Sequence, residues 1–174
     1  PGLAHIHYEL ARSIARGRLS TAAPDRRGEL AGRVEALARS AYELGRRPEA
    51  EARNLGVYAT FLAFVLLDLR PAPDHPAAEA AARDGVRARE AVYGVGHPLT
   101  SHPRAFLLRA LAGQGKAAEI ERVLRDLLAR DPKPQWDENA AKGLPAAARA
   151  LAKAERWEAA AIALEQAVRS GHYD

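Results

Sequence analysis

The sequence contains neither cysteine nor methionine, and it is poor in aromatic residues. Without cysteine there can be no disulfide, no thiolate metal ligand and no cysteine nucleophile. Aromatic residues make up 6% of the 174 residues, whereas proteins that bind nucleic acid usually combine a dense basic stripe with aromatic side chains for stacking. The net charge of +4 is modest and acidic residues are interspersed. We therefore expect no nucleic-acid binding.

Long apolar runs are also missing. The longest, Leu55 to Leu67, ends at Asp68 and Arg70 and is shorter than the roughly 20 residues that a membrane-spanning helix needs. It predicts a helix buried on most sides. With no signal peptide visible, we expect a cytoplasmic protein without a membrane span. The start at Pro1, without methionine, is what a piece of a longer protein would have.

Strong helix formers dominate what is present. Alanine, leucine, arginine and glutamate all favour helices, and no segment alternates at a period of two. Apolar residues recur at spacings of three and four, first at Leu3, Ile6, Leu10 and Ile14, and then at Leu30, Val34, Leu37, Ala41 and Leu44. Prolines and glycines mark the helix ends. The sequence predicts an all-α fold of eight helices.

An internal repeat of 40 residues relates the last two pairs of helices. Leu151 corresponds to Leu111, Leu164 to Leu124 and Ala167 to Leu127. Trp157 and Ala160 likewise correspond to Ala117 and Ile120. Matched apolar positions at this period are typical of helical hairpins that stack in a row.

The segment Ala105 to Pro132, AFLLRALAGQGKAAEIERVLRDLLARDP, resembles a tetratricopeptide repeat. Leu107, Leu108 and Leu111 occupy the apolar positions of the first helix, Gly115 lies at the turn, and Pro132 ends the second helix. The segment from Leu144 to His172 resembles the next repeat. Leu108 and Ile120 are bulkier than the Gly or Ala of that family, and His172 replaces its closing proline.

The stretch REAVYGVGHP, followed by GQGK after His97, is similar to the long-period repeats of the kinesin-light-chain type. In those repeats a G-x-x-H-P turn joins one hairpin to the next. The resemblance implies an alpha-alpha superhelix of about four hairpins in a single domain, 1–174. We place the hairpins at 1–46, 48–94, 99–132 and 139–172.

The histidines are the obvious candidates for metal ligands. Helical zinc ligands normally lie four apart on one face, whereas His97 and His102 are five apart with Pro98 between them. Proline is tolerated in the first turn of a helix, so we interpret His-Pro as the entry to a helix, with Pro103 in a first turn. His5 and His7 could share a metal only on an extended backbone. We predict no catalytic residue, no metal, no cofactor and no enzyme activity.

The resemblance implies a partner-binding face instead. In tetratricopeptide stacks the first helix of each hairpin lines the concave side, which places His102 and Arg109 there, and Lys142, Arg149 and Lys153 on the next hairpin. Arg109 and Arg149 are 40 apart and should lie side by side. Guanidinium groups pair with carboxylates, so we expect a protein or peptide partner, with an acidic one favoured.

Two further functions stay open at this point. The chain could be a regulatory or sensor module of a larger bacterial signalling protein, similar to the tetratricopeptide segments that follow serine/threonine kinase domains. It could also be a helical enzyme or ligand-binding domain built around the apolar helix 55–67. A fold alone does not decide between such functions.

Overall fold

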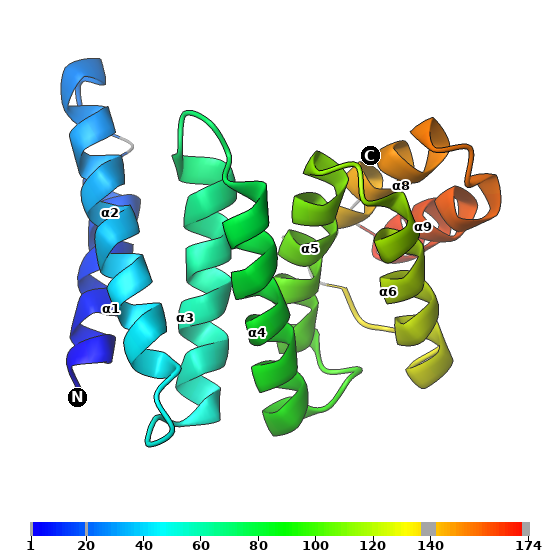
Figure 1. The fold of residues 1–174 in the computed structure, drawn as a ribbon, viewed down its shortest axis with the longest axis horizontal. Coiled ribbons are helices and arrows are strands. Elements are labelled where there is room, and N and C mark those ends of the chain that lie inside the picture. Colours follow the sequence, from blue (N-terminus) through cyan, green and yellow to red (C-terminus); the bar gives the residue numbers. More distant parts are fainter. Residues whose placement is uncertain (1, 20, 137–141, 172–174) are drawn as a thin grey trace.

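A computed structural model of the chain describes residues 2–19, 21–136 and 142–171. In this part of the chain the protein is all-helical and has no strand, which confirms the predicted all-α class. The proposed start of the last hairpin at 139 and its closing His172 lie outside the described residues. The helices follow one another along the long axis of the molecule (Figure 1).

Most helix ends agree with the proline and glycine signals, with Pro103 as an exception. The α-helices are α1 (Leu3–Ser13), α2 (Pro24–Gly45), α3 (Ala52–Phe64), α4 (His75–Tyr93), α5 (Pro98–Gly113), α6 (Ala117–Arg130), α8 (Gly143–Lys153) and α9 (Trp157–Arg169). Single π-helical turns, η1 (Ile14–Arg18) and η2 (Val65–Leu69), extend α1 and α3.

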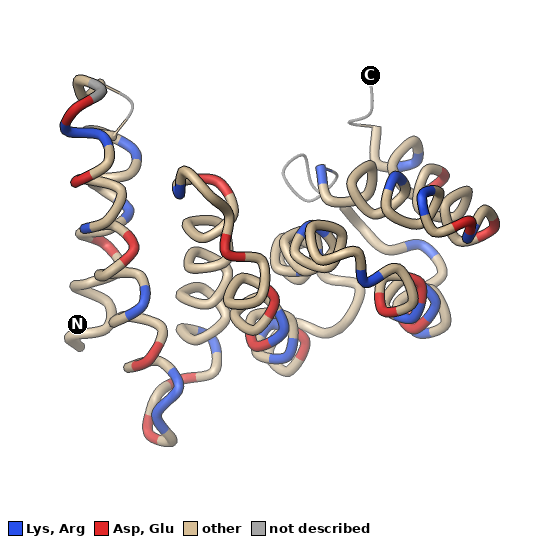
Figure 2. The backbone as a smooth tube through the Cα atoms, turned by 45° about the horizontal axis from the view of Figure 1, so that its top comes forward, with Lys and Arg blue, Asp and Glu red and all other residues tan. Residues whose placement is uncertain are grey.

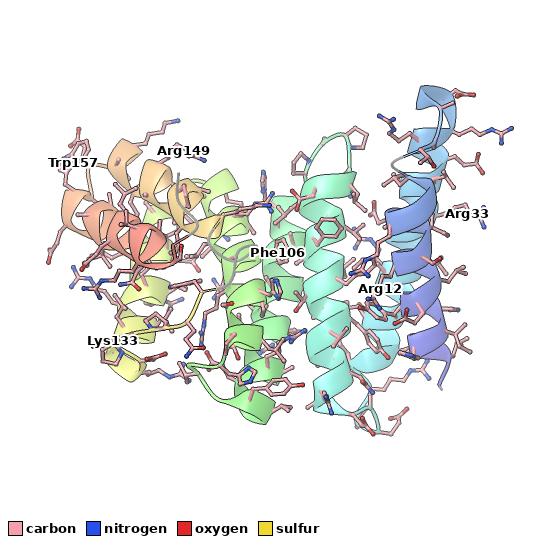
Figure 3. All side chains as sticks on the ribbon, turned by 180° about the vertical axis from the view of Figure 1, so that it is seen from behind. Arg12, Arg33, Phe106, Lys133, Arg149 and Trp157 are labelled. Carbon is pink, nitrogen blue, oxygen red and sulfur yellow. The ribbon has the colours of Figure 1, made fainter. Side chains whose placement is uncertain are left out.

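Neighbouring helices pack against each other in chain order, and α5 also packs against α3 and α8. The near side of Figure 1 is formed by α2, α4 and α6, and the far side by α1, α3 and α5, which face the viewer in Figure 3. Charges of both signs lie along α2, α4 and α6, whereas α3 is almost free of them (Figure 2).

The apolar run belongs to a longer helix than the sequence indicated. From Ala52 to Leu69, α3 and η2 form one rod of 18 residues that is long and apolar enough to cross a membrane by length and composition alone. A core helix satisfies the same criteria, and this rod packs between α2 on one side and α4 and α5 on the other. The absence of a membrane span therefore stays a prediction.

The first apolar stripe is helical as predicted, but most of it is not in the core. Leu3, Ile6 and Leu10 are 57%, 51% and 47% exposed, and only Ile14 is buried. Tyr8, which packs against Tyr58 and Phe61 of α3, lies on the opposite side of α1 from Ile6 and Leu10. Leu3, Ile6 and Leu10 thus face away from the rest of the chain, whereas Ile14 joins the core.

The interpretation of His97-Pro98 as a helix entry is confirmed. His97 is the N-cap of α5, and its Nδ1 accepts a hydrogen bond from the Leu99 backbone N–H at 3.1 Å. Its ring stacks on Tyr93, the last residue of α4. Thr100 closes the corner by donating its hydroxyl to the Gly94 carbonyl.

The prediction for Pro103 was wrong, because α5 begins at Pro98 and Pro103 lies inside it. Proline inside a helix removes a backbone hydrogen bond. Pro103 is fully buried against Gly85 of α4, where an added Cβ would lie 3.0 Å from the proline Cβ. The proline is therefore part of the α4–α5 contact.

Glycine permits a still closer contact between α5 and α8. A Cβ at Gly143 would lie 2.6 Å from the carbonyl oxygen of Ala105 and 2.7 Å from its Cα, distances that require the two backbones to separate. Gly32 on α2 is the opposite case, since a Cβ there would meet nothing within 4 Å.

An ion pair between the buried Arg104 and the half-buried Glu90 connects α5 to α4. Arg104, only 4% exposed, donates to the Val95 carbonyl at 2.8 Å and to Glu90 at 2.7 Å. The second carboxylate oxygen of Glu90 accepts a hydrogen bond from Arg130 of α6 at 2.6 Å. Burial alone would raise the pKa of Glu90, but the hydrogen bonds from Arg130 and Arg104 hold this pKa below its ordinary value.

The two glycines give a matched pair of variants. We expect Gly143→Ala to lower the free energy of unfolding by about 2 kcal/mol, because overpacking forces the helices apart. Gly32→Ala should raise it by about 0.5–1 kcal/mol, since alanine is the better helix former and has room there. Urea denaturation monitored by circular dichroism measures both. Equal effects of the two changes would contradict the α5–α8 contact.

Glu90 makes stability depend on pH. A carboxylate with a lowered pKa in the folded state stabilises the fold above its ordinary pKa, and this contribution is lost as the pH falls below it. Glu90→Gln leaves Arg104 buried without its carboxylate and should cost about 2 kcal/mol at pH 7. The difference in unfolding free energy between the wild type and Glu90→Gln should shrink as the pH falls. A cost that is unchanged in acid would show that packing, not charge, is responsible.

Candidate functional site

A row of aromatic side chains lines the face formed by α1, α3 and α5. It runs from Tyr8 through Phe61 and Phe64 to Phe106, and we call it the aromatic row. Successive ring centroids are 5.4, 6.1 and 6.3 Å apart, within the range of favourable aromatic pairs. The row forms one wall of an open groove of about 440 Å³.

Each end of the aromatic row carries an arginine. The Arg12 guanidinium lies 5.9 Å from the Tyr8 ring centroid, and that of Arg109 lies 5.7 Å from the Phe106 ring, both within cation–π range. Figure 3 labels Arg12 and Phe106, which lie on α1 and α5 along this face. The groove thus combines an aromatic wall with an arginine at each end, and Arg12 at one end is paired with Glu9 at 3.2 Å.

Arg109 is not the free groove cation that the sequence suggested. Its guanidinium forms a bidentate ion pair with Asp68 of η2, with one N–O distance of 2.9 Å. Both side chains are partly exposed, so the pair is a modest stabiliser. A ligand carboxylate that approaches Arg109 would have to compete with Asp68.

A second hollow, of about 370 Å³, adjoins the first at Arg109 and reaches α8. Arg149 and Lys153 line it; both are exposed, and neither forms an ion pair with any residue that the structure describes. His75 borders the hollow with its ring against Gly113, and its Nδ1 is buried without a hydrogen-bond partner.

The structure brings the five candidate residues to one side of the molecule. His102, Arg109 and Lys142 line the groove of the aromatic row. Arg109, Arg149 and Lys153 line the adjoining hollow, so the two arginines that are 40 residues apart share one cavity wall. This is a statement of position, and the assignment of these residues to partner binding stays a prediction.

Sequence reasoning missed the aromatic row and Arg12. Phe61 and Phe64 were assigned to a helix buried on most sides, yet both line the groove. All three phenylalanines of the chain border this groove, which the sequence alone does not indicate. Nor does the sequence indicate Arg16, which also lines it.

The metal site considered at His5 and His7 required an extended backbone, but both residues lie within α1. His5 is exposed, whereas the Nδ1 of His7 is 2.8 Å from the Ser40 hydroxyl of α2. Within the described ranges, no group of three or more histidine or carboxylate side chains is arranged to hold a metal ion.

Burial also raises the pKa of two tyrosines, Tyr58 beside the aromatic row and Tyr42 on α2. Burial raises the pKa of Tyr58, and the neighbouring Tyr8 adds to the increase. Burial, together with the hydrogen bond to Asp84, raises the pKa of Tyr42 well above its ordinary value. Both phenols therefore stay protonated at physiological pH, and Tyr42 donates its hydroxyl to Asp84 at 2.7 Å.

No protein-family model matches the chain, and a search of curated proteins finds no significant relative.

Proposed function

We propose that the chain is a non-catalytic protein-interaction domain that binds an acidic peptide or partner helix in the groove of the aromatic row. The charge of the groove wall is the main support. Five cationic side chains line it, and Asp68 is the one carboxylate among the described lining residues; the cations are Arg12, Arg16, Arg89, Arg109 and Lys142. The adjoining hollow adds Arg149 and Lys153.

The aromatic row supplies the apolar contacts of the proposed binding site. Aromatic side chains supply large apolar contact area and are enriched among the residues that dominate binding energy. A partner that fits would place an aliphatic or aromatic side chain on the row and its carboxylates at Arg12, Arg109 and Arg149. Such charges contribute to the association rate and to specificity more than to raw affinity.

We further propose that the four helix pairs stack as a tetratricopeptide-like superhelix with the first helix of each pair lining the groove. The 40-residue match, the His97-Pro98 corner and the shared cavity wall of Arg109 and Arg149 support this arrangement. A domain of this kind would also suit a larger signalling protein, in which it would recruit a partner.

Charge reversal tests the groove directly. A peptide selected from a random library on the wild-type chain should be rich in Asp and Glu. We expect Arg109→Glu combined with Arg149→Glu to weaken its binding at least about tenfold, because both attractive pairs become repulsive. Arg33→Glu, an exposed arginine of α2 outside the groove (Figure 3), is the matched control. Unchanged affinity in the double variant would refute the groove assignment.

Asp68 gives a test in the opposite direction. Asp68→Asn removes the carboxylate that is paired with Arg109. An acidic peptide should then bind a few times more tightly, because an exposed ion pair contributes no more than about 1 kcal/mol. The gain should disappear in the Arg109→Gln background. A titration by fluorescence anisotropy measures both. A gain that persists without Arg109 would show that Asp68 acts only through the general field of the groove.

A further inference from the structure

A further cavity lies on the other side of α5 from the aromatic groove. It has a volume of about 590 Å³ and opens between α4 and α6; we call it the α4–α6 pocket. Arg104 and Leu107 face it, whereas His102, Phe106 and Arg109 of the same helix face the aromatic groove. At about 100° per residue the two sets point to opposite sides of α5, so this pocket is separate from the groove.

Ion pairs between α4 and α6 close the pocket at both ends. At one end Arg83 meets Glu119 at 2.5 Å, and Glu79 meets Lys116 at 2.8 Å. At the other end Glu90 meets Arg130 at 2.6 Å. The window between these bridges is about 10 Å long on α4 and about 16 Å on α6, at 1.5 Å per residue. A small molecule fits such a window better than an extended polypeptide segment.

The floor of the pocket is apolar. Leu107 of α5 and Leu127 of α6 are buried, and Val86 of α4 and Val123 of α6 are half-buried beside them. The volume falls within the range of small-molecule sites, which are mainly apolar with a few placed polar groups.

Guanidinium groups dominate the polar rim. Five arginines line the pocket against three carboxylates; the arginines are Arg46, Arg83, Arg87, Arg104 and Arg130. Two of the carboxylates are already occupied, since Asp84 contacts Arg46 and Arg87 and accepts the Tyr42 hydroxyl, and Glu90 holds Arg104 and Arg130. The third, Asp126, is exposed.

Each of the five arginines is also ion-paired with a carboxylate, but a paired guanidinium keeps further N–H donors. Each guanidinium has five N–H donors, and the side chains of Arg87 and Arg130 are 78% and 51% exposed. The rim therefore offers N–H donors to an anion and few free acceptors to a cation.

We propose that the α4–α6 pocket binds a small amphipathic anion, with its apolar body on Leu107 and Val123 and its carboxylate at Arg87 and Arg130. This site goes beyond the proposed peptide groove and does not depend on it. The two bridges limit the length of the ligand, and the spare N–H donors of the exposed Arg87 and Arg130 favour an anionic group.

Decanoate is a suitable probe, measured by isothermal titration calorimetry with the full chain below the concentration at which the probe aggregates. We expect one molecule to bind per chain. Decan-1-ol and decyltrimethylammonium have the same body without the anion, and each should bind at least about tenfold more weakly, the usual worth of a charge-assisted hydrogen bond. Absence of decanoate binding, or equal binding of the cation, would overturn the proposal.

Two variants locate the site. Val123→Trp fills the floor and should weaken decanoate binding at least about tenfold, whereas Phe106→Ala, in the aromatic groove, should leave it unchanged. Arg87→Ala lies on the rim and should weaken binding of decanoate but not of decan-1-ol, which keeps the test decisive where the tryptophan disturbs folding. If neither Val123→Trp nor Arg87→Ala weakened decanoate binding, the probe would bind elsewhere, for example on the exposed stripe of α1. That result would refute the assignment.

Discussion

The close approach of α3, α4 and α5 is the constraint on which the rest of the structure depends. Gly56 of α3 lies against Arg89 and Ala88 of α4, and Gly85 of α4 lies against Thr60 on one side and Pro103 on the other. About half of the buried apolar residues in the described part are alanine. Small residues at helix crossings let backbones approach closely, because the separation of two helices depends on the side chains between them.

This spacing creates the aromatic row. Because α4 holds α3 and α5 close together, Phe64 and Phe106 come within 6.3 Å of each other across two helices. With bulkier residues at Gly56 or Gly85 the helices would separate and the row would break between its α3 and α5 members. The groove is therefore a consequence of the core, and its shape is as well defined as the packing beneath it.

The local features of this chain were predictable from the sequence, and the features that depend on distant contacts were not. His97 caps its helix through an interaction with its own neighbour Leu99, and proline and glycine mark helix ends locally. The Arg109–Asp68 pair joins residues 41 apart, and no spacing rule indicates which arginine meets which carboxylate. The exposed stripe of α1 shows the same limit, because periodicity identifies an apolar face without saying what covers it.

Acidic and basic residues are distributed unevenly among the helices. Helices α2, α4, α6 and α9 carry both signs, so their arginines find carboxylates nearby, as Arg39 does with Glu35. The sequences of α5 and α8 contain no acidic residue. The arginines of α5 take their carboxylates from other elements, Arg104 from α4 and Arg109 from η2.

The basic side chains of α8 form no such ion pair with the described residues. Arg149 and Lys153 reach the hollow beside Arg109, and no carboxylate is among its described lining residues. An uncompensated positive charge at a concave surface attracts anions more strongly than one on a convex face, because low-dielectric walls focus the field. In the proposed complex, a carboxylate of the partner would therefore be held most strongly at α8, next to the apolar contacts on the aromatic row.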